Sequence, residues 1–112
     1  MTKPTRCSER VSEHMNGRRF YVYMLSNNSH TIYVGVTNDV QRRLWEHRQK
    51  RADSFTRDYN ITMLVYLEEY ARADDAIARE KQLKNWRREK KVWLIEQENP
   101  NWLDLAHDWF DG

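Results

Sequence analysis

The chain has 112 residues, which is the length of one domain with one modest hydrophobic core. The formal net charge of +2 indicates no partner by itself, and the single cysteine excludes an internal disulfide, as expected in a reducing compartment. No apolar run approaches the ~20 residues of a membrane-spanning helix, and the first eighteen residues lack the apolar core of a signal peptide, so we expect a cytoplasmic protein without membrane contact.

The charged residues are unevenly distributed along the chain. Residues 1–60 carry 11 basic and 6 acidic side chains, whereas residues 61–112 carry 8 basic and 11 acidic ones. Seven of those eight basic residues lie between Arg79 and Lys91. A basic first half and one basic helix could form a positive face for nucleic acid, although such runs are more often simply solvated surface.

Two strands are predicted near the N-terminus. Residues 1–18 show no sustained periodicity, so we expect a flexible arm there and one domain over residues 19–112. The aromatic and apolar stretch 19–25 predicts a strand, residues 26–30 a turn and residues 31–36 a second strand. A five-residue connection is typical of a β-hairpin.

The register of this hairpin decides which side chains meet. Pairing Leu25 with Thr31 would place Tyr23 directly opposite Tyr33, with their Cβ atoms ~5 Å apart. The opposite face would then be purely apolar, formed by Phe20, Val22, Met24, Ile32, Val34 and Val36. We therefore expect one face to be core and the other to present two phenols above Gly35. Tyrosine is also a common strand residue, so the pair alone does not define a site.

A helix is predicted after the second strand. Asn38 and Gln41 have the spacing of a capping box. One face of the helix is formed by residues at i, i+4 and i+7, namely Val40, Leu44 and His47. Arg43 lies one turn before His47 and shares its face, close to the tyrosines. Arginine binds phosphate well, while a lone histidine at such a position is commonly just a core residue.

The second half predicts a strand and helices. Residues 61–68 predict a third strand, and residues 74–90 a long helix whose first acidic residues suit the helix dipole. Residues 91–97 would continue or restart this helix, and Asn99-Pro100-Asn101 would end it. The amphipathic end of the chain is expected to pack on the core through Trp102, Leu105 and Trp109. The order ββαβαα predicts an α+β fold, with a small mixed or antiparallel three-stranded sheet covered by helices.

Glu80 is anomalous because it falls on the expected apolar face of the second helix, among Ala76, Ile77 and Leu83. An unpaired carboxylate buried there would be costly. Two interpretations stay open: an ion pair, for example with Arg43, or a single carboxylate ligand for Mg²⁺. Basic side chains along the same helix, with one from the first helix, could follow a nucleic-acid backbone: Lys84, Arg87, Arg88, Lys91 and Arg42.

Several of these stretches together resemble the GIY-YIG endonuclease family, in particular its small stand-alone bacterial members with a URI-type domain. The two name-giving tripeptides are Tyr21-Val22-Tyr23 and Tyr33-Val34-Gly35, and they are followed by "VGVTNDVQRRLWEHR", "AREKQLKNWRREKK" and "NPNW". The resemblance covers residues 19–105. It departs at Tyr21, which replaces the first glycine of the family motif, and a late family asparagine could be Asn85 or Asn99.

The resemblance implies a three-stranded antiparallel sheet flanked by helices and metal-dependent hydrolysis of DNA phosphodiesters with Mg²⁺ or Mn²⁺. It implies catalytic roles for Tyr23, Tyr33, Arg43 and His47, a supporting role for Gly35 and metal binding by Glu80. One tyrosine would orient or deprotonate a water, and because phenol has a pKa near ~10, nearby cations would have to lower it.

The expected function is therefore a metal-dependent DNA endonuclease of low or structure-dependent specificity. Alternatives are a non-catalytic nucleic-acid-binding module, a nuclease acting on RNA or through a partner, and an interaction protein using the Trp-rich tail. The expected oligomeric state is a monomer or weak dimer.

Overall fold

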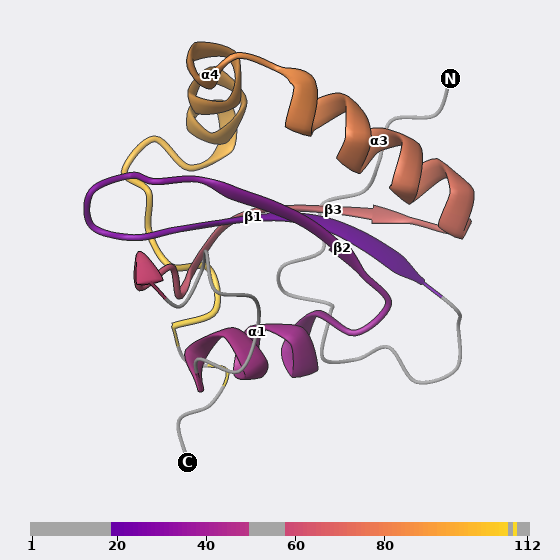
Figure 1. The fold of residues 1–112 in the computed structure, drawn as a ribbon, viewed down its shortest axis with the longest axis horizontal. Helices are drawn as coiled ribbons and strands as arrows, with labels where there is room; N and C mark the ends of the chain where they lie inside the picture. Colours follow the sequence, from indigo (N-terminus) through magenta and orange to yellow (C-terminus); the bar gives the residue numbers. More distant parts are fainter. Residues whose placement is uncertain (1–18, 50–57, 108, 110–112) are drawn as a thin grey trace.

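The computed structural model describes residues 19–49, 58–107 and 109, so the arm expected at 1–18 lies outside the described residues. A three-stranded antiparallel sheet of order β2-β1-β3 has α1 on one face and α3 and α4 on the other (Figure 1). The elements are β1 (Phe20–Ser26), β2 (Tyr33–Thr37), α1 (Val40–Arg48), β3 (Met63–Tyr70), α3 (Ala73–Asn85) and α4 (Arg88–Glu98). The α+β class and the order ββαβαα are confirmed.

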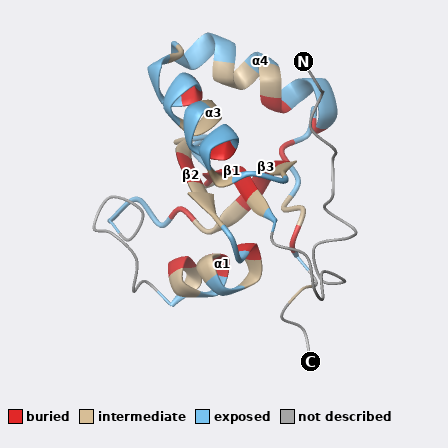
Figure 2. Cartoon of the chain, turned by 90° about the vertical axis from the view of Figure 1, so that its right-hand side faces the viewer, coloured by how far each residue is buried: buried red, intermediate tan, exposed pale blue. Residues whose placement is uncertain are grey.

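The sheet is buried on both faces, and each face has its own apolar cluster. On the α1 side the cluster contains Tyr21, Tyr23, Leu25, Val40, Leu44, Ile61, Leu64, Leu67 and Ala106. On the other side it contains Val22, Met24, Val34, Val65, Tyr66, Ala76, Leu83, Ile95 and Trp102. Figure 2 shows buried segments on the strands and also on the helices that cover the sheet. The alternation of strand residues between two faces is as expected, but the tyrosine face is also core, because α1 covers it. In the described part of the chain, no helix is long and apolar enough to span a membrane.

The hairpin register differs from the predicted one by two residues. Tyr23 pairs with Gly35 and Leu25 with Tyr33, so the prediction that the two tyrosines are directly opposite is wrong. The cause lies in the loop, where the Asn27 side-chain oxygen accepts hydrogen bonds from the backbone N–H of Ser29 (3.0 Å) and of Thr31 (2.9 Å). These bonds hold Thr31 in the turn rather than in the ladder. Because the shift is even, every side chain keeps its expected face.

The first helix begins after Asp39, not after Asn38 as the capping box predicted. The Asp39 carboxylate accepts a hydrogen bond from the Arg42 N–H at 3.1 Å, and the Asp39 N–H donates to the Thr37 hydroxyl at 3.1 Å. An aspartate cap one residue later satisfies the same helix-end donors. The predicted buried face of α1 is confirmed, since Val40, Leu44 and His47 are buried.

The long helix expected over residues 74–90 is two helices. Trp86 and Arg87 have extended backbone, with ψ of 149° and 158°, so α3 ends and α4 restarts at an angle (Figure 1). The Trp86 ring packs against the apolar cluster between the sheet and helices α3 and α4. The guanidinium of Arg79 lies 5.2 Å and the ammonium of Lys90 4.2 Å from the ring centroid. These contacts link residues of both helices and favour the break. The third strand likewise begins later than expected, at Met63, since Asn60 has a left-handed φ of 56°.

The chain after α4 follows the outer edge of β3. The Asn99 amide donates to the carbonyl oxygens of Val65 (3.1 Å) and Leu103 (2.9 Å), and the Leu105 N–H donates to Leu64 at 2.8 Å. This pairing satisfies edge groups that would otherwise be open. The expected end of the helix before Asn99 is confirmed, as is the packing of the three apolar tail residues on the core: Trp102, Leu105 and Trp109.

Candidate active site

The first helix holds a histidine directly over the hairpin tyrosines. The hydroxyl of Tyr23 lies 3.4 Å from Nε2 of His47, and both side chains are buried. Their ring centroids are 6.2 Å apart in an edge-on arrangement. Since His47 continues the apolar stripe of α1, packing of that stripe on the sheet is what brings the imidazole to the phenol.

Gly35 allows Tyr23 to reach this position. The two residues are cross-strand partners, and the Tyr23 ring lies across the backbone of Gly35. A Cβ atom at Gly35 would be 2.4 Å from the Tyr23 hydroxyl oxygen and 2.5 Å from Cζ, far inside van der Waals contact. The glycine is therefore required by the phenol that crosses it, not by an unusual φ angle.

Tyr33 is the more accessible of the two tyrosines. Tyr23 is 2% exposed, whereas Tyr33 is partly buried at the rim of the cluster. The Tyr33 ring centroid lies 5.3 Å from that of His47 and 6.3 Å from that of Tyr23. The three rings thus form one group, in which Tyr33 is partly exposed and Tyr23 is buried.

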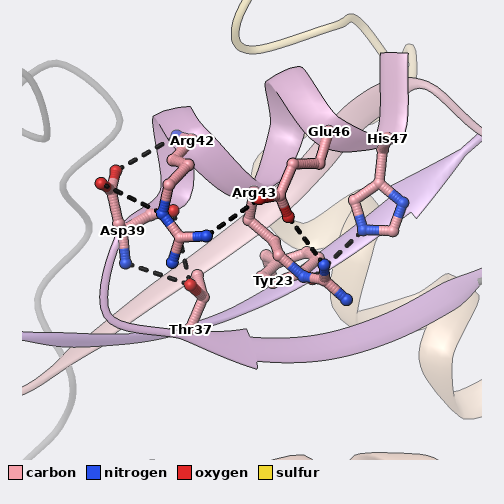
Figure 3. Close-up of polar contacts among 7 residues, drawn as sticks. All are labelled: Tyr23, Thr37, Asp39, Arg42, Arg43, Glu46 and His47. Carbon is pink, nitrogen blue, oxygen red and sulfur yellow. Dashed lines mark hydrogen bonds and ion pairs between the residues drawn. The ribbon is translucent and has the colours of Figure 1, made fainter. Parts of the chain in front are cut away.

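Arg43 completes this group from the preceding turn of α1 (Figure 3). Its Nη1 donates to Oε1 of Glu46 at 2.9 Å, and its guanidinium also hydrogen-bonds Tyr23. Burial alone would lower the pKa of Arg43, but the bond to Glu46 and the two phenols raise it above its ordinary value. The site therefore contains a permanently charged guanidinium beside Tyr23.

Glu46 is a site residue that the sequence reasoning missed. It accepts from Arg43 through one oxygen and from Arg42 Nη1 through the other, at 3.0 Å, while Arg42 also lies 3.7 Å from Asp39. The hydrogen bond from Arg43 is the main cause that lowers the pKa of Glu46. The spacing of Glu46 at i+3 and i+4 from two arginines was the available signal.

Glu80 lies on α3, in the layer on the other side of the sheet from the rings (Figure 1). Its side chain is 12% exposed, and its Oε2 lies 2.6 Å from Nζ of Lys84. The expected ion pair thus exists, but with Lys84 rather than Arg43. Of the predicted apolar neighbours, Ala76 and Leu83 are buried, while the prediction for Ile77 is wrong because it is 42% exposed. Helix α3 contacts β2, an outer strand of the sheet that has α1 on one side and α3 on the other (Figure 2).

The carboxylate of Glu80 is chemically suited to a hard divalent cation. Among the residues that the structure describes, no cluster of three or more His, Cys, Asp or Glu side chains could hold a metal ion. A single carboxylate suits Mg²⁺, which keeps several waters and binds substrate phosphates. In the structure the ammonium of Lys84 is paired with this carboxylate.

The predicted basic residues are clustered where α3 meets α4. Arg87 and Arg88 are exposed, and Arg88 Nη1 donates to the His30 carbonyl at 2.7 Å. Burial, and next the charge of Lys84, lower the pKa of Lys91. Arg42 lies apart from this cluster on α1, paired with acidic neighbours.

The sequence reasoning also missed a buried ion pair between β3 and α3. Glu68 is 2% exposed and accepts from Arg79 Nε and Nη2, both at 3.0 Å. The hydroxyl groups of Tyr66 and Tyr70 also donate to this carboxylate. Because the Glu68 carboxylate is fully hydrogen-bonded, its role is to connect β3 to α3.

Comparison with known proteins gives one consistent result. The model of the GIY-YIG catalytic domain matches residues 19–92. UPF0213 protein HQ_3675A of Haloquadratum walsbyi is 35% identical over 77 residues, covering 69% of this chain and 86% of that protein. UPF0213 protein NP_0776A of Natronomonas pharaonis is 36% identical over 78 residues, covering 70% and 92%. The solution structure of UPF0213 protein BH0048 from Bacillus halodurans has a TM-score of 0.51 at 24% identity, covering 84% of this chain and 99% of that one, which supports the fold.

Proposed function

The chain belongs to the GIY-YIG family of nuclease domains, and on that basis we propose that it is a divalent-metal-dependent endonuclease that hydrolyses phosphodiester bonds in DNA. The observation that supports this most directly is the convergence of Tyr23, Tyr33 and His47 into one group of rings, with the Arg43 guanidinium beside them. These residues come from two strands and a helix, and a structural core needs no such combination of polar groups.

In this proposal the three ring residues have different roles in activating the water and accepting its proton. Tyr33 is partly exposed and would be the phenol that contacts an attacking water. His47, whose ring centroid lies 5.3 Å from that of Tyr33, would take up or relay the proton. Tyr23 is buried, and its contact with Nε2 holds the imidazole in place. We therefore assign Tyr33 to the water and Tyr23 to positioning.

Arg43 is the group for the phosphate. Glu46 accepts from Nη1, which fixes the plane of the guanidinium, and the remaining N–H groups can donate to non-bridging oxygens. A guanidinium fixed before the substrate arrives stabilises added negative charge on phosphorus without reorganisation.

Glu80 would hold the metal ion, Mg²⁺ or Mn²⁺. Such an ion supplies charge stabilisation for the phosphate and the leaving oxygen. The basic side chains near the junction of α3 and α4, namely Lys84, Arg87, Arg88 and Lys91, would contact the nucleic-acid backbone on the same helical layer.

The proposal is tested by nicking of supercoiled and branched DNA in Mg²⁺, in Mn²⁺ and in a chelator. We expect Tyr33→Phe, Arg43→Met and Glu80→Gln each to reduce the metal-dependent rate by at least about a hundredfold, the scale of one lost catalytic group. Arg72→Met and Glu89→Gln, at exposed positions, are the matched controls and should cleave like wild type.

Equal cleavage by wild type and all three site variants would contradict the proposal and point to a contaminating nuclease. Binding of DNA that persists in a chelator, with no product in either metal, would favour a binding module instead. Product from RNA alone would change the substrate class while keeping the site.

A further inference from the structure

Lys84 and Glu80 form a close ion pair along α3. The distance from Nζ to Oε2 is 2.6 Å, and the residues are one helical turn apart. The carboxylate side chain is only 12% exposed, whereas that of Lys84 is 52% exposed. The acid is thus fixed in the protein, while its partner is a long side chain that can reach solvent.

A second cation lies close to this pair. Burial, and next the charge of Lys84, lower the pKa of Lys91 at the start of α4. Lys84 is therefore attracted by Glu80 and repelled by Lys91, in a cluster that also contains the exposed Arg87 and Arg88. A polyanion bound at this cluster would offer Lys84 a new partner and would screen its repulsion from Lys91.

We propose that Lys84 is an internal counter-ion that occupies Glu80 in the free protein and is drawn away by nucleic-acid phosphate, so that metal and nucleic acid bind cooperatively. This inference rests on the proposed role of Glu80 as metal ligand. An ammonium and a divalent ion cannot share one carboxylate oxygen without repulsion, so the ion must displace Lys84. Phosphate that holds Lys84 elsewhere removes that competition, and the coupling is reciprocal.

The prediction is measured as Mn²⁺ binding by the whole chain, from the electron paramagnetic resonance signal of free Mn²⁺. Without nucleic acid, Lys84→Met should bind Mn²⁺ about two- to fivefold more tightly than wild type, the scale of an exposed ion pair. Lys84→Arg keeps the counter-ion and should resemble wild type. Lys81→Met, an exposed lysine on the same helix, is the matched control for loss of one positive charge.

The second arm adds a short DNA duplex with non-hydrolysable linkages, after subtraction of the Mn²⁺ that the duplex binds alone. We expect the duplex to raise the Mn²⁺ affinity of wild type and of Lys81→Met, but to have little effect on Lys84→Met. Unchanged or weaker Mn²⁺ binding by Lys84→Met, with binding still lost in Glu80→Gln, would overturn the counter-ion inference and leave the metal site intact. Equal Mn²⁺ binding by Glu80→Gln and wild type would instead remove the metal ligand, and both proposals about it.

Discussion

At the residue scale, the shape of the candidate site depends on Gly35 having no side chain. Gly35 leaves the space that the Tyr23 ring occupies, and the Tyr23 hydroxyl then reaches His47. Arg43 is in turn held by Glu46. Each polar group is positioned by a neighbour that does no chemistry itself, which is how a small site keeps a fixed geometry.

Replacement of Gly35 by alanine is expected to displace the Tyr23 ring. A methyl group 2.4 Å from the phenol oxygen cannot be accommodated, and overpacking of a buried position costs about 1–3 kcal/mol of unfolding free energy. Urea denaturation of Gly35→Ala, Tyr23→Leu and the double variant measures this. The alanine should cost less when Tyr23 is already leucine, and strictly additive losses would contradict the assignment.

The pKa of Glu46 reports the Arg43 contact. Hydrogen bonding from Arg43 is the main cause that lowers this pKa, so its stabilising effect is present above the ordinary carboxyl pKa and is lost as pH falls through the lowered value. Carboxyl ¹³C NMR titration of Arg43→Met should show the pKa of Glu46 moving up toward 4.5. Arg42→Met should produce a smaller rise, and the reverse order would contradict the geometry described here.

At the scale of elements, local patterns predicted what depends on local residues. Alternation in the strands predicted which residues share a sheet face, and helical spacing placed His47 on the inward face of α1, where it is fully buried and not at the edge of the buried surface. The predicted hairpin register was wrong because the side chain of Asn27 lengthens the turn. The helix break at Trp86 was not predicted because it depends on contacts with Arg79 and Lys90. The bonds of Asn27 are local and the contacts of Trp86 join two helices, but neither set leaves a periodic signal in the sequence.

The joint between β3 and α3 should be a major source of stability. Arg79→Met would leave the Glu68 carboxylate, 2% exposed, without its cation, and breaking a buried pair in this way costs about 3–5 kcal/mol. The exposed pair of Arg72 with Asp74 offers the control, since Arg72→Met should cost less than about 1 kcal/mol. Urea denaturation of both variants checks this, and similar losses would mean that Glu68 is not buried as described.

At the scale of the whole molecule, the chain after α4 holds the two cores together. Asp104 accepts from Arg48 Nη2 at 2.7 Å and from the Leu64 N–H at 3.1 Å, so it joins α1 to β3. Trp102 belongs to the cluster under α3 and α4, while Leu105 and Trp109 pack on the cluster under α1. The segment that the sequence predicted to pack on the core thus connects the apolar clusters on the two faces of the sheet.

One experiment should distinguish the roles of Asn85 and Asn99, the two candidates for the late family asparagine. Asn99 is 4% exposed and bonds both to Val65 and, in both directions, to Leu103, whereas Asn85 is exposed at the end of α3. Asn99→Ala leaves the Val65 carbonyl, which lies in a buried hydrogen bond, and two part-buried backbone groups of Leu103 without this partner, and is expected to cost about 2 kcal/mol in unfolding free energy, with Asn85→Ala near zero. Thermal denaturation and DNA nicking are measured on the same samples. Activity of Asn99→Ala should fall only in proportion to its folded fraction, because its side chain holds the chain after α4 in place; full stability with lost cleavage would instead assign it to the chemistry.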